Sequence, residues 1–364
     1  MKIESLAIAL APAALIAALA CAAHAQTPVQ PSPYREGYRK SSEAADRIAT
    51  ASTSNSDLPA GYRIFPFDVE NATATSLRGI AGNKIVGCYM TGSKAAGTHT
   101  HGLSALFVPN QPMSSRTEDV PGALNTYPSG INSESQIVGH INPVSNAITN
   151  QGFFNNGGSV STIVGPGSSQ TLSGTLASGI DSKGQIVGSY STGLMTHGFL
   201  QVNGQLTTFD YPHDSQIITD WTTIPTGINE NGFVVGVHSG AGGINMGSIA
   251  GSQTGDAIGN HGFVWNLNSG IFYTLDDPDS DSNTVPTSIN SGDQVAGYFA
   301  DGRGTHGFVF GPAADGSWGF ATVDVPGAGT TRIFGLGDDG TIVGDYTDSK
   351  GMTHGFVAVP SPGN

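Results

Sequence analysis

The chain has 364 residues, a formal net charge of −14 and only 12% charged residues, while 38% hydrophobic residues leave enough apolar surface for packed strands. This composition argues against wholesale disorder. It also argues against binding to nucleic acid or anionic membranes, because both require a basic face and the only basic cluster is the short "YREGYRK" from Tyr34.

The first 25 residues are typical of a secretory signal peptide. Lys2 precedes the apolar run "LAIALAPAALIAALA", and "AHA" supplies small residues for cleavage after Ala25. A lipoprotein signal cleaved before Cys21 is the alternative, although "ALAC" fits it poorly. No later stretch is long and apolar enough to predict a membrane span. We therefore expect a secreted or periplasmic protein.

The segment that follows the signal lacks strand alternation. Residues 26–60 are rich in Pro, Ser, Thr and Ala, which predicts a flexible linker. Cys88 is the one cysteine left after cleavage, so no internal disulfide is expected. Its position inside a strand pattern favours a buried hydrophobe over a reactive nucleophile.

A single module is repeated along residues 61–364. Gly-Ile or related pairs begin at positions 79, 130, 179, 227, 288 and 335, so most copies are 47–51 residues apart and one spacing is 61. The long spacing comes from an insertion in the fourth copy, at residues 239–260. Such a period indicates one repeat domain.

Each copy contains four strand-like segments. In the third copy they are "LASGI" (176–180), "QIVGSY" (185–190), "HGFLQV" (197–202) and "QLTTFD" (205–210). The intervening "DSKG" and "NG" are typical turn sequences. Pro212 ends the last strand, because proline cannot donate to a strand ladder.

Four antiparallel strands in each of six copies are typical of a β-propeller. We therefore predict an all-β, six-bladed β-propeller of four-stranded antiparallel blades. The last copy (335–360) lacks a fourth strand, whereas residues 63–69 resemble an isolated one. The N-terminal strand is predicted to complete the sixth blade and close the ring, which would remove the free sheet edges.

A glycine recurs in the middle of every predicted second strand, where glycine normally costs stability. These glycines are Gly87, Gly139, Gly188, Gly236, Gly297 and Gly344. Their common register predicts the close approach of another backbone or of a ring. The third strands supply large side chains that we expect between sheets, namely Phe153, Phe199, Phe263, Phe308 and Phe356.

Two segments display the repeat most fully: "DVPGALNTYPSGINSESQIVG" (119–139) and "DVPGAGTTRIFGLGDDGTIVGDY" (324–346). Together with the later H-G-F, their pattern resembles that of the HAF-type extracellular repeat family, over residues 62–360. Departures include Gln151 for the histidine of copy two and Leu103 for the phenylalanine of copy one. The resemblance implies a secreted bacterial propeller-like protein and no catalytic residues.

Histidines and aspartates also recur once per copy. The histidines are His101, His197, His261, His306 and His354, and the aspartates that precede the D-x-P turns are Asp68, Asp119, Asp210, Asp276 and Asp324. One histidine per blade would place them around a ring instead of at one metal. We predict that each histidine fixes its own blade by a backbone hydrogen bond and that the aspartates cap turns.

One acidic turn could hold a cation. In "DDPDSDSN" (276–283), Asp277, Asp279 and Asp281 could supply oxygen ligands to calcium. The glycine and the closing glutamate of an EF-hand are missing and Pro278 interrupts the pattern, so a solvated turn is favoured and calcium is the alternative. No other cofactor or metal is predicted.

Common enzyme motifs are absent from the sequence, including G-x-S-x-G, H-E-x-x-H and a phosphate-binding loop. We therefore favour an exported, non-catalytic, monomeric propeller that binds an extracellular glycan, peptide or surface protein. The alternative is an extracellular hydrolase or lyase with its active site in the central funnel. Converging acidic and histidine side chains there would favour the enzyme, and a Gly/Ser/Thr surface the binding protein.

The predicted loops differ between the two ends of the strands. At one end they vary in length, and at the other they are short and repetitive ("NSES", "DSKG", "NENG"). Variable loops are typical of binding surfaces. We therefore place the candidate ligand site at Tyr211, His213, Asp220 and Trp221, with the Trp221 indole as the anchor. The alternative is that Trp221 is buried between blades.

Overall fold

The computed structural model describes residues 61–93, 97–143, 150–168, 174–193, 195–212, 221–240, 260–281, 283–313 and 316–361. These residues form 24 strands and no helix, so none of them could cross a membrane as a helix. The predicted signal peptide and linker lie outside the described residues. The protein is all-β, as the sequence predicted.

Consecutive strands pair antiparallel in groups of four, which we call meanders. The first three meanders are β2 (Ala74–Ala81), β3 (Lys84–Ser93), β4 (Gly97–Leu106) and β5 (Ser114–Thr117); β6 (Ala123–Ile131), β7 (Ile137–Pro143), β8 (Gln151–Asn156) and β9 (Ser159–Ile163); and β10 (Thr175–Ile180), β11 (Ile186–Thr192), β12 (Met195–Val202) and β13 (Gln205–Phe209). The next two are β14 (Trp221–Ile228), β15 (Phe233–Gly240), β16 (His261–Asn266) and β17 (Ile271–Thr274); and β18 (Thr284–Ile289), β19 (Val295–Asp301), β20 (Gly304–Pro312) and β21 (Trp318–Val323).

The last group combines the two ends of the described chain. It contains β22 (Thr330–Leu336), β23 (Ile342–Thr347) and β24 (Thr353–Pro360). β1 (Tyr62–Phe67) pairs antiparallel with β24, from Tyr62 opposite Pro360 to Phe67 opposite Gly355. The first and the last described strands are therefore neighbours in one sheet.

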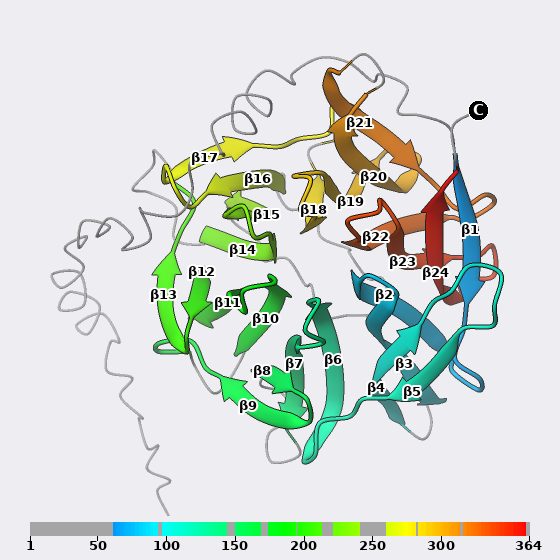
Figure 1. Ribbon diagram of the computed structural model, residues 1–364, viewed down its shortest axis with the longest axis horizontal. Coiled ribbons are helices and arrows are strands. Elements are labelled where there is room, and N and C mark those ends of the chain that lie inside the picture. The colour runs from blue at the N-terminus through cyan, green and yellow to red at the C-terminus, as the bar shows by residue number, and fades with distance from the viewer. Residues whose placement is uncertain are drawn as a thin grey trace, which may run out of the picture. The chain divides into compact units, whose positions relative to one another are not determined.

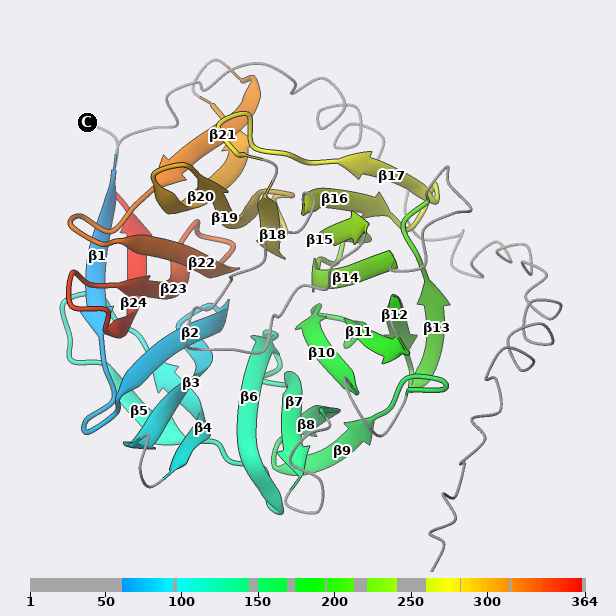
Figure 2. The ribbon, with the colours of Figure 1, turned by 180° about the vertical axis from the view of Figure 1, so that it is seen from behind.

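The meanders are arranged around a common centre in the fold of a β-propeller (Figure 1, Figure 2). The first strand of each meander faces the centre and the fourth lies outermost. Burial follows this order: the second strand β11 begins with five buried residues, whereas all four residues of the outermost β5 are exposed. Buried apolar clusters combine residues of neighbouring meanders, such as Phe233 with Ile289 and Leu77 with Val343.

The mid-strand glycines have the role predicted for them. A Cβ on Gly188 would collide with the carbonyl oxygen of Leu176 on the first strand and would lie 2.8 Å from the Phe199 ring on the third. Phe199 itself is fully buried. The same glycine–carbonyl–phenylalanine contact recurs at Gly139, Gly297 and Gly344. Glycine is required there because backbone and ring fill the space of a side chain.

A second set of glycines brings the first strands together at the centre. The strand register shifts just before Gly79 and at the matching position of every later copy. A Cβ on Gly79 would lie 3.1 Å from the Cα of Gly130, and one on Gly335 would lie 3.2 Å from the Cα of Gly79. β22 therefore approaches β2 as closely as β2 approaches β6.

The recurring histidines and aspartates bind each other, which corrects the roles predicted for them. Nδ1 of the third-strand histidine lies 2.7–2.9 Å from a carboxylate oxygen of the aspartate after the fourth strand in all five pairs. The histidine therefore bonds to a side chain instead of the backbone. The carboxylate holds the third strand instead of capping its own turn.

Candidate functional site

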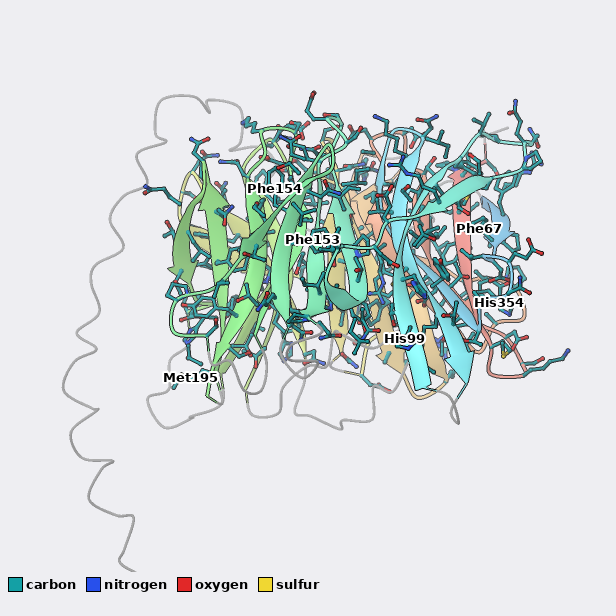
Figure 3. All side chains as sticks on the ribbon, turned by 90° about the horizontal axis from the view of Figure 1, so that it is seen from below. Phe67, His99, Phe153, Phe154, Met195 and His354 are labelled. Carbon is teal, nitrogen blue, oxygen red and sulfur yellow. The ribbon has the colours of Figure 1, made fainter. Side chains whose placement is uncertain are left out.

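A central pocket of about 190 Å³ opens at one end of the first strands. It is lined by all six of them, near the turns that lead to the second strands. We call this the short-loop end, because these turns are the short repetitive ones. Met195, at the start of β12, and His99, near the start of β4, lie at the opposite end of the strands (Figure 3).

The floor of the pocket is formed by one residue from each first strand, the residue that precedes the central glycine or its equivalent. These residues are Arg78, Ser129, Ser178, Thr226, Thr287 and Phe334. The register shift in each first strand falls at this position. The floor therefore consists of the same position in each of the copies.

Two of the six floor residues are bonded to neighbouring strands. Thr226 Oγ1 donates to the carbonyl oxygen of Pro286 at 2.7 Å, and Thr287 Oγ1 donates to that of Ile333 at 2.8 Å. Both bonds link one first strand to the next. In the part of the chain that the structure describes, Ser129 and Ser178 make no such bond, so their hydroxyls can bind a ligand.

Arg78 is the one cation of the floor. Its Cζ lies 4.0 Å from the centroid of the Phe334 ring, and its buried Nε has no hydrogen-bond partner. Among the described residues no carboxylate forms a salt bridge with it. Arg332 differs, because both oxygens of the buried Asp345 bind its guanidinium at 2.8 and 3.1 Å.

Burial sets the charge of three titratable side chains around Arg78. Burial, and then the charge of Arg78, lower the pKa of His140 to about 3. Burial raises the pKa of the Cys88 thiol to about 11, although Arg78 opposes this shift. Burial also raises the pKa of Tyr127. These three side chains are therefore neutral at pH 7, and none of them carries a charge opposite to that of the guanidinium.

Asparagines join neighbouring turns around the pocket. Asn132 Nδ2 donates to the Asp181 carbonyl oxygen at 2.9 Å, and Asn229 and Asn290 donate in the same way to the carbonyl oxygens of Asn290 and Gly337. Asp181 occupies the corresponding position in the third copy. Its Oδ2 is buried without a partner, and burial raises its pKa to about 6 despite two backbone hydrogen bonds to Oδ1.

Of the four predicted ligand residues, His213 and Asp220 lie outside the described residues. The backbone of Trp221 begins β14 opposite Gly240, and the prediction for its side chain also lies outside the described residues. Tyr211 stacks on His238 with ring centroids 3.6 Å apart, and its hydroxyl contacts Thr274 Oγ1. Tyr211 thus packs against its neighbours, and the proposed site as a whole stays a prediction.

The acidic turn proposed for calcium has an internal structure. Asp277 is buried, and its Oδ1 accepts a 2.9 Å hydrogen bond from the backbone of Asp279. The backbone of Asp281 donates to the Ala300 carbonyl oxygen. No cluster of three or more potential metal-binding side chains is found in the described ranges. Calcium binding stays a prediction.

Sequence reasoning missed Arg78 and the histidine–aspartate pairing, although both left a signal. Aligned at the central glycine, the copies carry Ser, Thr or Phe where the first has Arg78, so the arginine is the exception in that column. The second copy replaces histidine by Gln151 and has Val164 at the aspartate position. Their joint loss in one copy indicates that the two side chains depend on each other.

Several solved structures resemble this chain at low sequence identity. The β-propeller domain of the Trilobed protease from Pyrococcus furiosus has a TM-score of 0.43 and 8% identity over 80% of this chain and 95% of that one. A gluconolactonase from Xanthomonas campestris has a TM-score of 0.42 and 12% identity over 85% and 96%. No protein-family model and no curated protein matches the sequence. Similarities at these TM-scores identify no activity.

Proposed function

We propose that this chain is a non-catalytic binding propeller that takes a small polar ligand into its central pocket. The observation that carries the proposal is the floor, where the Ser129 and Ser178 hydroxyls and a guanidinium whose Nε has no hydrogen-bond partner line a cavity of about 190 Å³. Concave sites with a few convergent polar groups are typical of ligand binding.

We further propose that the meanders are six blades of a ring that β1 closes. Three contacts support closure: the β1–β24 ladder, the approach of Gly335 to Gly79, and a shared apolar cluster. In that cluster Leu77 and Ile85 of the first meander pack with Val343 and Val357 of the last. A closed ring would hold the six floor residues at fixed distances.

Export and the HAF-type relationship belong to the same proposal. The signal-like residues 1–25, the linker-like residues 26–60 and the repeat pattern support a secreted or periplasmic propeller. An extracellular glycan or peptide is then the natural source of a small polar ligand, and a monomer would suffice to bind it.

The hydrogen bonds of two pocket carboxylates favour a binding function over a hydrolase or a lyase. Asp181 accepts hydrogen bonds from two backbone amides of its own turn, and Asp338 Oδ1 accepts one from the Ser291 amide at 2.9 Å. These two carboxylates therefore bind turn backbone, and Glu230 is the third carboxylate that lines the pocket. The rest of the lining is rich in Gly, Ser, Thr and Asn, which is the surface expected of a binding protein.

A glycan and peptide array, followed by pocket-blocking variants, tests the proposal. Ser178→Phe places a ring in the floor, and Ser115→Phe adds the same ring on the exposed outer strand β5 as the control. We expect at least one array ligand to lose binding with Ser178→Phe and to keep it with Ser115→Phe.

A third variant separates the two ends of the propeller. Loss of binding in Trp221→Ala with full binding in Ser178→Phe would move the site to the variable loops and refute the pocket. Turnover of a ligand by the purified protein would instead favour the enzyme in the central funnel.

A further inference from the structure

We propose that the free half of the pocket floor is a carboxylate site, in which Arg78 binds the anion and Ser129 and Ser178 donate hydroxyl hydrogen bonds. The ligand class is a small polyhydroxylated acid, and a hexuronic acid is the member we test. This inference rests on the proposed pocket function and adds to it the charge of the ligand.

The geometry of the floor restricts where an anion can bind. Arg78, Ser129 and Ser178 come from three successive first strands, whose central glycines are in backbone contact. On the other side, the Thr226 and Thr287 hydroxyls are engaged with carbonyl oxygens. Free donors are thus collected on one side of the pocket. A carboxylate has two oxygens, which suit a guanidinium on one side and hydroxyls on the other.

The electrostatics of the floor also call for an anion. A cation held away from water is stabilised by a paired negative charge. Asp345 neutralises Arg332, whereas His140 and Cys88 beside Arg78 are uncharged at pH 7. The Phe334 ring under the guanidinium excludes water from one face of it. A ligand carboxylate would supply the missing counter-charge.

The size of the cavity limits the ligand to about one ring. An apolar cavity of about 150 Å³ holds a benzene molecule, and this pocket measures about 190 Å³. One sugar ring therefore fits, and a longer glycan would have to extend through the mouth. The backbone carbonyl oxygens of Ser129 and Ser178, which lie beside the central glycines, can accept hydrogen bonds from sugar hydroxyls.

Calorimetric titration of the purified chain with glucuronate and with glucose tests the inference, because the two sugars differ only in the carboxylate. We expect glucuronate to bind at least about ten-fold more tightly, since charge-assisted hydrogen bonds are roughly twice as strong as neutral ones. Added salt should weaken glucuronate selectively. A glucuronate-ended trisaccharide distinguishes a free acid sugar from the end of an acidic glycan as the source, by which of the two binds more tightly.

Arg78→Gln should abolish the preference for glucuronate, and Arg78→Lys should retain part of it. Arg116→Gln is the matched control, because it removes the same charge from an arginine whose side chain is 77% exposed on β5. Melting temperatures establish that each variant is folded. If Arg78→Gln does not fold, the affinities of the unaltered chain for glucuronate and glucose still test the carboxylate site.

Equal affinity for the two sugars, no binding of glucuronate, or a preference that survives in folded Arg78→Gln would overturn the carboxylate site. A neutral array ligand that Ser178→Phe displaces would leave the proposed binding function standing while this inference failed. If Ser178→Phe affects no ligand at all, the proposed function itself fails.

Discussion

At the scale of single residues, the repeat is most informative where one copy departs from the others. Asp181 stands where asparagines of other copies donate to the next turn, and its buried Oδ2 has no partner. An ionised carboxylate cannot donate a hydrogen bond. The third copy therefore lacks one of the bonds that join neighbouring turns at the short-loop end.

Asp181→Asn should restore that donor and stabilise the protein at neutral pH. The pKa of Asp181 is raised to about 6, so the native state binds more protons than the unfolded state between about pH 4 and 6. Stability is then lost as pH rises through this window. We expect Asp181→Asn to increase the free energy of unfolding by about 1–3 kcal/mol at pH 8 and by much less at pH 4.

Chemical denaturation at the two pH values measures this difference. Glu134→Gln, which removes an exposed carboxylate in the preceding copy, is the control and should show no pH-dependent gain. An equal effect of Asp181→Asn at both pH values would show that the titration of Asp181 does not limit stability.

The ion pair of His354 and Asp68 predicts a variant that loses stability, in contrast to Asp181→Asn. Burial lowers the pKa of His354, but the hydrogen bonds and charges of Asp68 and Asp348 outweigh it, so that the pKa is raised. A raised histidine pKa stabilises the fold below about pH 6.5, and this contribution is lost as pH rises through the folded value. Asp68→Asn should therefore cost more stability at pH 5.5 than at pH 8.5.

The expected loss at pH 5.5 is about 0.5–1 kcal/mol, because the Asp68 side chain is 50% exposed and solvent screens the pair. Urea unfolding at both pH values measures it, with Glu70→Gln as the neighbouring exposed control. A cost that does not change with pH would mean that the pair acts only as a neutral hydrogen bond.

At the scale of the strands, the close approach of backbone to backbone decides which residues are possible. The first, second and third strands of a meander meet at the mid-strand glycine, where a carbonyl oxygen and a phenylalanine ring occupy the side-chain position. Protein interiors are close-packed, so an added methyl group there must displace one of them. The neighbouring carbonyl belongs to a strand ladder and cannot move alone.

Gly188→Ala should consequently destabilise the protein by about 1–3 kcal/mol. Gly157→Asn is the contrasting variant, because nothing lies within 4 Å of Gly157 and its φ of 62° is one that asparagine tolerates. Thermal unfolding of the two variants should show a clear loss for the first and little change for the second. A Gly188→Ala protein as stable as the parent would contradict the packing described here.

At the scale of the whole molecule, the first described strand stabilises the last meander. β1 pairs with β24 along its whole length, and Phe65 and Phe67 pack on the cluster shared with the first meander. Without β1, the edge of β24 would have free amides and carbonyls, and an unpaired edge is a template for association.

Deletion of residues 61–70 should lower the melting temperature and produce concentration-dependent association, which light scattering measures. A chain that begins at residue 61 controls for trimming of the preceding segment, and it should melt like the longer chain. An unchanged melting temperature together with a monomer after the deletion would refute closure by β1.

The sequence by itself determined the elements of this protein, because each copy repeats the same local pattern. Alternating apolar residues, turn sequences and mid-strand glycines specify four strands and their faces within one copy. The all-β propeller predicted from them is confirmed at that level, and the glycines contact a carbonyl and a ring as expected. The number of blades, the closure and the export remain proposals.

Only the tertiary structure decided which side chains meet, because contacts between copies depend on three-dimensional register and not on local pattern. It paired histidine with aspartate across the sheet, and it brought one column of the repeat to the pocket floor. It also showed that Arg332 has a carboxylate partner and that Arg78, on the neighbouring first strand, has no salt bridge among the described residues. Two arginines of equal charge differ in this way because their pairing depends on the residues that neighbouring strands place beside them.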